Sequence, residues 1–432
     1  MSRAQDWPVA VRLVDVADDI AAITDIREYP RTRVFVAERG ALIGSLDIHN
    51  AWRPISADQL RQTIGESLAN PLLRRAVVRQ LGAAEAPLLD ERVSVSVVVP
   101  SCGRPADLRR CLTSLQEQVT RRRVEVIVVD NRPGERATSD VAGEFPNVRL
   151  VTEAKPGLSY ARNAGFAAAT GDILVAIDDD VIAPPDWLEQ LLASFAKPEV
   201  MAVTGHVLPF ELETRAQCWF EAYGGLGKGF MRREANGHWF RGRRSAAPTW
   251  ELGATANAAF RASVFRDPRV GMLDEALGAG TPAGCSEDTY LFYRMLKAGH
   301  TIVYEPTAWV WHRHRRDDRA LRQQISAYSR GHVAYQLITL TRDGDRRALV
   351  RLGWSLPKAY VRRTFERLLG YSDYPVRLIL TEIAGNLAGP WALARSIRRA
   401  RRLGPGARCA SADVVARSAR ASVEIAPARE RA

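Results

Sequence analysis

Three consecutive carboxylates follow a short apolar run in "ILVAIDDDV", where Asp178, Asp179 and Asp180 stand side by side. Like charges this close repel one another, so a cation is expected beside them. Carboxylate oxygens suit Mg²⁺ or Mn²⁺, and such an ion often keeps open positions for substrate phosphates. The sequence therefore predicts a divalent metal that bridges the protein to a diphosphate. The alternative is that the aspartates cap the helix predicted in "PPDWLEQLLASF", a role for which Asp186 is better placed.

A second acidic pair, Glu287-Asp288, opens the helical pattern "EDTYLFYRMLKAGH". A carboxylate at the start of a helix can be held by backbone N–H groups, and it can take a proton from a hydroxyl. The pair is therefore a candidate general base. The alternative is two acids that merely offset the helix dipole. The three aspartates upstream favour the catalytic interpretation.

The segment "AWVWHRHRR" (308 to 316) places His312 and His314 two residues apart, hence on one side of an extended strand. A histidine here could be a further metal ligand. A basic patch that contacts phosphates is the alternative, and both interpretations stay open.

Short runs rich in Val and Ile alternate with helical patterns from residue 93 onward. The runs are "VSVSVVVP", "VEVIVVD", "NVRLVTE" and "DILVAIDDD". Runs that are apolar on both faces indicate strands buried in a parallel sheet, and the alternation predicts an α/β domain with βα crossovers. Ligands of such sheets bind beyond the carboxyl ends of the strands, so the polar residues at those ends should converge on one edge.

Four motifs in order resemble the family 2 glycosyltransferases of the GT-A fold, over about residues 93 to 315. They are "VSVVVPSCGRPADLRRCLTSL", "VIVVDNRP", "KPGLSYARNAGFAAATGDILVAIDDDV" and "CSEDTYLFYRMLKAG". The resemblance implies transfer of a sugar, of the hexosyltransferase type, from a nucleotide-diphosphate donor with inversion at the anomeric carbon. It also implies Mn²⁺ or Mg²⁺ as cofactor.

The same resemblance implies roles for individual residues. The nucleotide-sugar contacts are Pro100, Asp130, Lys155, Arg162, Asp178 and Asp179. The metal ligands are Asp180 and His312, and the split of roles among the three aspartates stays open. Asp288 is the general base, and Glu287 holds the acceptor or local structure. The acceptor side includes Trp250, Gly253 and Ala254. One departure is "PSCGRP", where Cys102-Gly103 replaces the aromatic-Asn pair of many relatives.

We expect three parts in the chain. Residues 1–92 form a small α+β module of unknown role, with a strand pair in "RVFVAERGALIGSLDI" and a helix capped by Ser56. Residues 82–92 are its expected linker. Residues 93–320 form the GT-A domain, and residues 321–432 form a basic helical region, disordered from "GPGARCASADVV" onward.

The net charge of +12 lies almost wholly in the C-terminal region, because residues 323–432 hold 20 Lys plus Arg and 8 Asp plus Glu. A basic region on a neutral body suggests contact with an anionic surface, and basic amphipathic helices often lie on membranes. The hypothesis is docking at the inner face of the cell membrane, where a lipid-linked or envelope glycan would be the acceptor. The alternative is a solvated, Arg-rich helical face.

The sequence also indicates the compartment. No window is long and apolar enough to span a bilayer, no secretory signal is visible, and the five cysteines form no CxxC pair. We expect a cytoplasmic protein with reduced thiols. Two other functions remain as alternatives: an inactive nucleotide-sugar-binding protein, and a nucleotidyltransferase that uses the same sheet. Nucleic acid is not an expected partner, since no RNP or KH pattern occurs.

Overall fold

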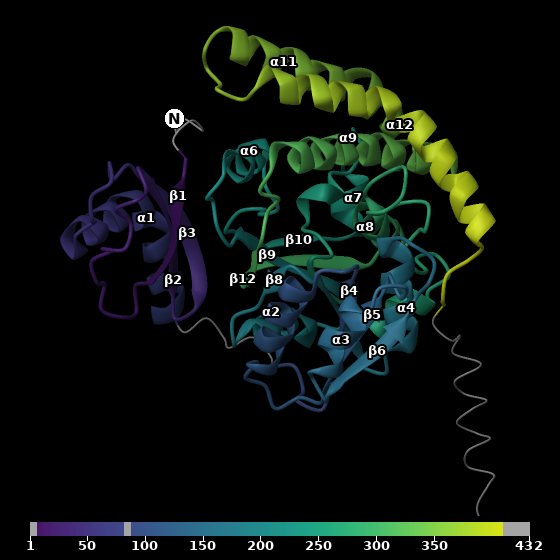
Figure 1. Cartoon of the computed structure of the whole chain (residues 1–432), viewed down its shortest axis with the longest axis horizontal. Helices are drawn as coiled ribbons and strands as arrows, with labels where there is room; N and C mark the ends of the chain where they lie inside the picture. The colour runs from purple at the N-terminus through teal and green to yellow at the C-terminus, as the bar shows by residue number, and fades with distance from the viewer. Residues whose placement is uncertain (1–6, 82–87, 409–432) are drawn as a thin grey trace, which may run out of the picture.

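The computed structural model describes residues 7–81 and 88–408. A small N-terminal module lies beside a larger α/β domain, and the C-terminal helices cover one side of that domain (Figure 1).

The N-terminal module is a three-stranded sheet backed by one long helix. Its elements are β1 (Val9–Asp15), β2 (Arg31–Glu38), β3 (Ala41–Ile48) and α1 (Ala57–Gln80). β2 and β3 form the predicted hairpin, and Arg39 and Gly40 at its turn both have positive φ, as two-residue hairpin turns require. The hydroxyl of Ser56 accepts a hydrogen bond from the Gln59 N–H at 3.2 Å, which confirms the predicted cap. β1, which pairs parallel with β2, was not predicted.

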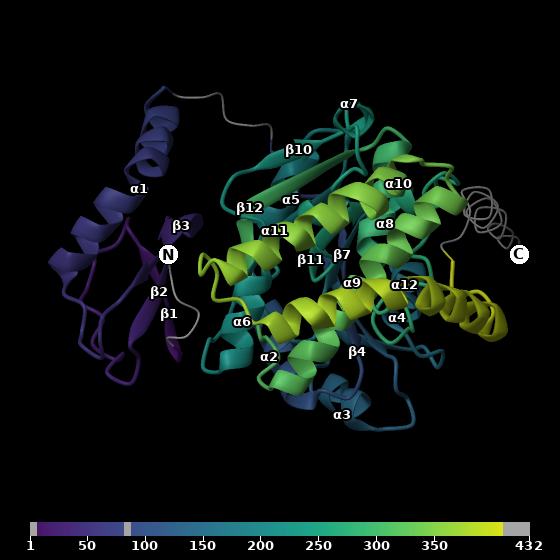
Figure 2. The same cartoon turned by 90° about the horizontal axis from the view of Figure 1, so that it is seen from above.

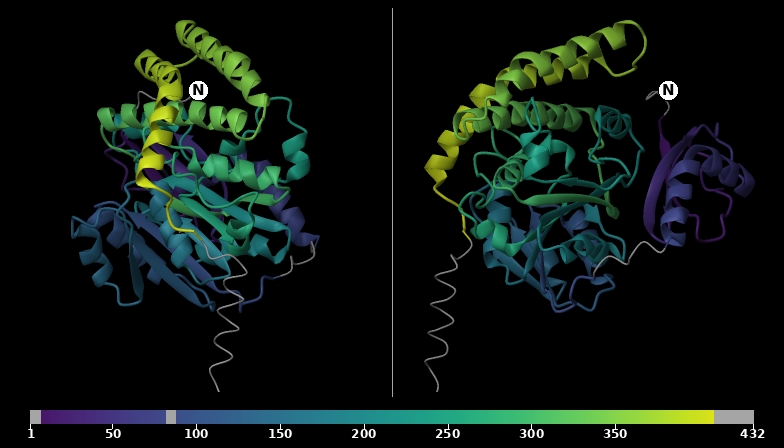
Figure 3. Two further views of the ribbon diagram at one scale, coloured as in Figure 1. Left: turned by 90° about the vertical axis from the view of Figure 1, so that its right-hand side faces the viewer. Right: turned by 180° about the vertical axis from the view of Figure 1, so that it is seen from behind.

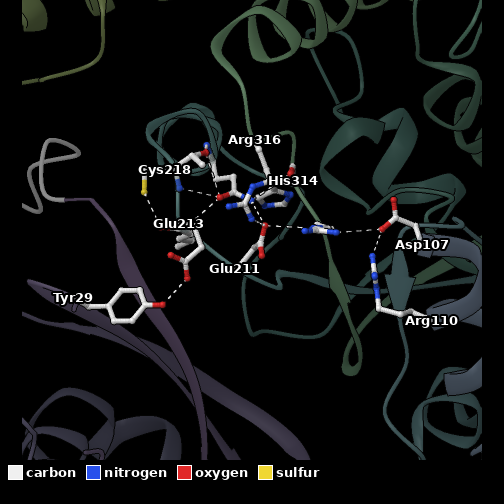
Figure 4. Close-up of polar contacts among 12 residues, drawn as sticks. Tyr29, Asp107, Arg110, Glu211, Glu213, Cys218, His314 and Arg316 are labelled. Carbon is white, nitrogen blue, oxygen red and sulfur yellow. Dashed lines mark hydrogen bonds and ion pairs between the residues drawn. The ribbon is translucent and has the colours of Figure 1, made fainter. Parts of the chain in front are cut away.

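The module packs on the edge of the large domain. The apolar part of this contact consists of Phe35, Ala37, Leu42, Leu208 and Trp309. The indole N–H of Trp309 donates to the carbonyl of Gly40 at 3.0 Å. The hydroxyl of Tyr29 donates to Glu213 at 2.7 Å, as Figure 4 shows. Apolar packing and polar contacts therefore both join the module to the domain.

The large domain is built on one mixed sheet with strand order β10-β12-β9-β11-β7-β4-β5-β6. The strands are β4 (Val95–Ser101), β5 (Val124–Asp130), β6 (Val148–Thr152), β7 (Ile173–Ile177), β9 (Val200–Pro209), β10 (Arg233–Ala235), β11 (Asn257–Arg261) and β12 (Thr301–His312). The four runs predicted as parallel strands are β4 to β7, and their pairings are parallel. The short strand β8 (Val181–Ile182) pairs with the end of β12 outside this order.

Helices cover both faces of this sheet. One face carries α2 (Pro105–Gln116), α3 (Ala137–Gly143) and α5 (Trp187–Leu192), and the other carries α4 (Leu158–Ala168) and α8 (Glu287–Lys297). α4 lies close to β4 because it has Gly165 at the contact, where a Cβ atom would come within 2.3 Å of the Val98 side chain. This close approach fixes the position of Arg162, one turn earlier in α4.

The C-terminal helices form two further layers above the second face (Figures 1 and 3). α9 (Asp318–Thr341) lies on the domain, and α11 (Leu356–Leu368) and α12 (Val376–Leu403) lie outside it. Gly385 and Gly389 let α12 approach α9 closely, since a Cβ atom at either would fall within 2.7 Å of α9 side chains. Within the described residues, no helix is both long and apolar enough to cross a bilayer.

The remaining helices are short. α6 (Arg215–Tyr223) and α7 (Gly237–Arg241) lie in the chain between β9 and β11. α10 (Arg347–Val350) and a π-helical turn (Arg351–Ser355) lead from α9 into α11.

Two sequence-based expectations are corrected. Asp186 occupies the N-cap position of α5, but its side chain makes no capping hydrogen bond. Residues 404–408, expected to be disordered, pack on the large domain instead. The Tyr160 hydroxyl donates to the carbonyl of Gly404 at 3.0 Å, and a carboxylate oxygen of Glu275 accepts from the Gly406 N–H at 3.2 Å. The rest of that expected segment, 409–432, and residues 82–87 of the expected linker lie outside the described residues.

His206 on β9 predicts an acid dependence of stability. The side chain is buried, and burial lowers its pKa from 6.5 to about 4, with the charge of Glu221 opposing and that of Lys228 adding to the shift. The unfolded chain binds this proton near its ordinary pKa, while the folded protein does not. The free energy of unfolding should therefore fall by roughly 3 kcal/mol as the pH drops from 6.5 to 4. Guanidinium unfolding at several pH values measures how the free energy of unfolding depends on pH. This dependence should be weaker in His206→Gln than in the wild type, and an equal dependence would contradict the expectation.

Candidate active site

A large cavity of about 1210 Å³ lies at the carboxyl ends of the parallel strands. Its walls include the ends of β4 and β7, the loop 223–228 after α6, the segment 253–256 before β11 and the start of α8. Helices α9, α11 and α12 complete the wall with residues such as Tyr328 and Asn386. This is the place where open α/β sheets bind their ligands.

Arg104 lies between two of the three aspartates that follow β7. Its guanidinium nitrogen Nη1 is 2.6 Å from the carboxylate of Asp180 and 3.3 Å from that of Asp179. Asp179 also accepts a hydrogen bond from the Ser101 hydroxyl, at the end of β4, at 2.8 Å. Arg104 belongs to the "PSCGRP" motif, but the motif by itself indicated no role for this residue. It supplies part of the positive charge that adjacent carboxylates require.

Asp178, Asp180 and His312 form a group that could hold a metal ion, since one ligand atom of each lies within 4.8 Å of the others. The pairing of β8 with β12 produces this group, because it sets His312 opposite Val181, the neighbour of Asp180. Two carboxylates and one imidazole fit a divalent cation, and the imidazole favours Mn²⁺ over Mg²⁺. The grouping contains the predicted ligands Asp180 and His312 and adds Asp178.

Burial and charge act in opposite directions on the titration of this group. Burial alone would raise the pKa of Asp180, but the charge of His312 and its hydrogen bond lower that pKa below its usual value. Burial disfavours protonated His312, yet the charge of Asp180 raises its pKa. Burial and the charge of Asp180 raise the pKa of Asp179 to about 7. Asp180 and His312 lie 3.3 Å apart, so each favours the charged form of the other.

Arg162 joins the aspartates to the second acidic pair. Its side chain is 1% exposed, and its two terminal nitrogens lie 2.6 Å from Asp178 and 2.9 Å from Glu287. The ion pairs therefore connect the carboxyl end of β7 to the start of α8. A buried guanidinium between two carboxylates holds both acidic segments in one geometry.

The two acids at the start of α8 lie in different surroundings. Glu287 is buried, and burial together with the charge of Asp288 raises its pKa to about 7, although Arg162 opposes this shift. Asp288 lies on the cavity wall. Its carboxylate accepts from the N–H of Thr289 at 2.6 Å and from the N–H of Thr255 at 3.4 Å. Backbone N–H groups thus orient the carboxylate of Asp288 at the cavity. There it can take a proton from a bound hydroxyl.

A chain of contacts leads from the N-terminal module to the candidate metal ligands. Arg33 on β2 lies 3.0 Å from Glu221, whose other oxygen lies 3.0 Å from Nε2 of His314. The Nδ1 atoms of His314 and His312 are 3.1 Å apart. Groups that hold a metal-ligating histidine fix its orientation. The module of unknown role therefore contacts the side chains that position His312.

This chain of contacts predicts an effect on metal affinity. Glu221→Gln should weaken Mn²⁺ binding about tenfold, because the neutral amide holds His314 less firmly and so leaves His312 less well oriented. Calorimetric titration of the protein with Mn²⁺ measures the affinity directly. The matched control is Glu213→Gln, which also loses a carboxylate bound to the N-terminal module through Tyr29. Equal losses in the two variants would contradict the expectation.

The structure brings most of the predicted site residues to this cavity. Those that line it are Pro100, Arg162, Asp178, Asp179, Asp180, Trp250, Gly253, Ala254, Glu287, Asp288 and His312. Two others are not among its lining residues. Asp130 is buried and accepts from the N–H of Arg132 at 2.9 Å, and the ammonium of Lys155 donates to the carbonyl of Pro405 at 2.6 Å.

The sequence alone did not indicate that α11 and α12 contribute to the cavity. Glu382 accepts hydrogen bonds from Tyr360 at 3.1 Å, Tyr374 at 3.0 Å and Arg363 at 2.7 Å. Asn386 donates to the hydroxyl of Tyr360 at 2.8 Å. Four of these five residues, all but Tyr374, line the cavity. The available signal was the presence of Glu382 and Asn386 within the otherwise apolar segment "LILTEIAGNLAGPWALA".

An open α/β sheet with polar side chains at the carboxyl ends of its strands is typical of proteins that bind a ligand there. The family model for Glycosyl transferase family 2 matches residues 96–267, and this chain belongs to that family. The predicted fold class is confirmed: an α/β domain of the GT-A type with a small N-terminal α+β module and a basic, helical C-terminal region.

Relatives that match the chain over at least half of its length include two bacterial proteins. The pre-mycofactocin glycosyltransferase of Mycobacterium tuberculosis is 30% identical over 60% of this chain, which spans only 50% of that relative. The succinoglycan biosynthesis protein ExoM of Rhizobium meliloti is 30% identical over 51% of this chain and 67% of its own length. Among solved structures, a mannosyltransferase from Pyrobaculum calidifontis, in complex with GDP-Man and Mn²⁺, has a TM-score of 0.42 and 19% identity, covering 83% of this chain and 90% of its own.

Proposed function

We propose that this chain is an inverting glycosyltransferase that moves a sugar from a nucleotide-diphosphate donor to a hydroxyl acceptor. The observation that carries the proposal is that one cavity contains both the group Asp178, Asp180 and His312 and the oriented carboxylate of Asp288. Membership of glycosyltransferase family 2 supports sugar transfer as the reaction.

The donor occupies the part of the cavity at the strand ends. Pro100 and the aspartates line this part, and Arg104 and Arg162 are the cations nearest the aspartates. Asp178, Asp180 and His312 would hold Mn²⁺ or Mg²⁺, which would supply positive charge against a diphosphate leaving group. Asp130 and Lys155 are donor contacts by family resemblance alone.

Asp288 acts as the general base. Its carboxylate removes the proton of the acceptor hydroxyl while that oxygen bonds to the anomeric carbon. The bond from this carbon to the diphosphate breaks on the opposite face, which inverts the configuration. The N–H groups of Thr255 and Thr289 hold the carboxylate in place during the transfer. Glu287, paired with Arg162, has a positioning role.

The acceptor occupies the part of the cavity walled by segment 250–254 and the C-terminal helices. Gly253 has a φ of 106°, and a Cβ atom there would fall 2.5 Å from Thr204, so this wall requires glycine. Trp250, with the guanidinium of Arg351 4.9 Å from its ring centre, supplies an aromatic surface for a sugar ring. We propose a glycan or lipid-linked sugar as acceptor, reached at the inner face of the cell membrane through the basic region 323–432.

Calorimetric binding of UDP, GDP and dTDP, each with and without Mn²⁺, tests this function. We expect one nucleotide to bind in a metal-dependent manner, and Asp180→Ala to abolish the metal dependence. Asp186→Ala is the control, because Asp186 is a nearby carboxylate outside the cavity lining. If none of the nucleotides binds to the wild-type protein, the proposal fails. Release of pyrophosphate from nucleoside triphosphates would instead indicate a nucleotidyltransferase.

A further inference from the structure

The outermost helices present a set of large apolar side chains to solvent. Four precede or lie on α11 and four lie on α12: Trp354, Val361, Phe365, Leu368, Val376, Leu380, Leu387 and Trp391. Each is 50% exposed or more, and Leu368 and Trp391 exceed 70%. We name these eight residues the outer stripe. Soluble proteins seldom expose apolar surface in such a cluster unless it binds something.

The spacing of the exposed apolar residues on α12 places them on one face of the helix. On α12, Val376, Leu380, Leu387 and Trp391 are separated by four, seven and four residues, so they share one face of the helix. The opposite face, with Leu378 and Ile379, is buried. The stripe is therefore the outward face of an amphipathic helix rather than a scatter of single residues.

Unpaired basic residues accompany the stripe. Lys358 on α11 and Arg395, Arg398 and Arg402 on α12 are exposed and form no ion pair with any residue of the described ranges 7–81 and 88–408. A second copy of the chain would set one positive surface against another, which disfavours a symmetric dimer through this face. An anionic surface with an apolar interior matches both the charge and the apolar side chains.

We infer that the outer stripe inserts into the interfacial region of an anionic lipid bilayer, with α11 and α12 lying along the membrane. Amphipathic helices of this kind bury their apolar face about 5 to 10 Å deep while basic side chains contact the headgroups. Trp354 and Trp391 suit this depth, because tryptophan favours the membrane–water interface. The inference deepens the proposed function and rests on it for the membrane location of the acceptor.

The inner sides of the same helices wall the cavity. Tyr360 and Arg363 of α11 and Glu382 and Asn386 of α12 are lining residues, and Figure 2 shows both helices spread over the domain. A stripe inserted in the bilayer would therefore hold the acceptor part of the cavity directly beneath the headgroups. An acceptor sugar on a lipid anchor could then enter the cavity while its anchor stays in the membrane.

The test measures sedimentation of the full chain with vesicles of phosphatidylcholine containing about 30% phosphatidylglycerol. The variant Phe365→Glu/Leu368→Glu/Leu387→Glu should bind these vesicles at least about tenfold more weakly than the wild type. The matched control, Leu73→Glu/Val78→Glu/Val119→Glu, makes the same charge change at exposed apolar residues elsewhere and should bind nearly as the wild type does. If both variants bound the vesicles equally weakly, the added negative charge alone would explain the loss. That result would overturn the inference.

Two further measurements separate the remaining outcomes. Brominated lipids should quench tryptophan fluorescence of the wild type, and Trp354→Phe/Trp391→Phe should lose most of that quenching. If the wild type formed a dimer and bound no vesicles, and the stripe variant were a monomer, the outer stripe would be a contact between two copies of the chain. That result would overturn the inference. Nucleotide binding, measured on the same variants, distinguishes failure of the membrane inference from failure of the proposed transferase function. If the wild type binds nucleotide but no vesicles, membrane insertion is refuted and the transferase function is not.

Discussion

Asp288→Asn should lower the rate of sugar transfer by about 10² to 10⁴-fold, because the amide cannot accept the proton of the acceptor hydroxyl. The side chain keeps its shape, so nucleotide binding should stay within about twofold of the wild type. The readout that needs no identified acceptor is slow hydrolysis of the donor sugar, in which water takes the place of the hydroxyl.

The control for this substitution is Asp317→Asn. Asp317 also lines the cavity, and its carboxylate caps α9 by accepting from the Ala320 N–H at 2.8 Å, a bond that asparagine can replace. This variant should keep its activity. If Asp288→Asn keeps a rate similar to that of Asp317→Asn, the base is a different residue.

Arg162→Met should destabilise the protein by about 3 to 5 kcal/mol, because it leaves Glu287 buried beside Asp288 without its cation and deprives Asp178 of its partner. Acid should relieve part of this loss. Burial has already raised the pKa of Glu287 to about 7, so the carboxyl takes up its proton as the pH falls below that value. Guanidinium unfolding at pH 8 and pH 5 measures both effects.

A second substitution tests the cause of this loss. Arg162→Met/Glu287→Gln removes the unpaired charge and should recover part of the stability at pH 8. Arg109→Met is the control, since its ion pair with Glu144 lies at the surface and should matter little. A loss in Arg162→Met that is independent of pH and of Glu287 would show that packing, and not charge, causes it.

Much of the fold was predictable because its signals are local. The four parallel strands follow from runs of Val and Ile, and α4 and α8 follow from apolar residues at helical spacing. β1 escaped prediction because "VAVRLVD" is flanked by no turn signal that marks a hairpin, and its partner β2 lies beyond a long connection. The expected disorder after Gly404 was wrong for 404–408, because contacts with Tyr160 and Glu275 hold that segment.

The residues of the candidate site were likewise predictable from the sequence only in part. Asp178, Asp180 and Asp288 could be singled out because acidic residues stand next to strand ends and helix starts in the sequence itself. Arg104 could not be, since an arginine ahead of a helix is common and its role depends on the fold. The part of α12 in the cavity was hidden for a similar reason: Glu382 interrupts an apolar helix, but only packing shows what it faces.

By itself the sequence determined the α/β domain, its family and the acidic residues at the strand ends and at the start of α8. These follow from the order of apolar and polar residues among close neighbours in the chain. Only the tertiary structure decided that His312 joins Asp180, that Arg162 links Asp178 to Glu287, and that the N-terminal module and the C-terminal helices contribute to the site. Each of these contacts joins residues far apart in sequence, and the pairing of strands and packing of helices bring them together.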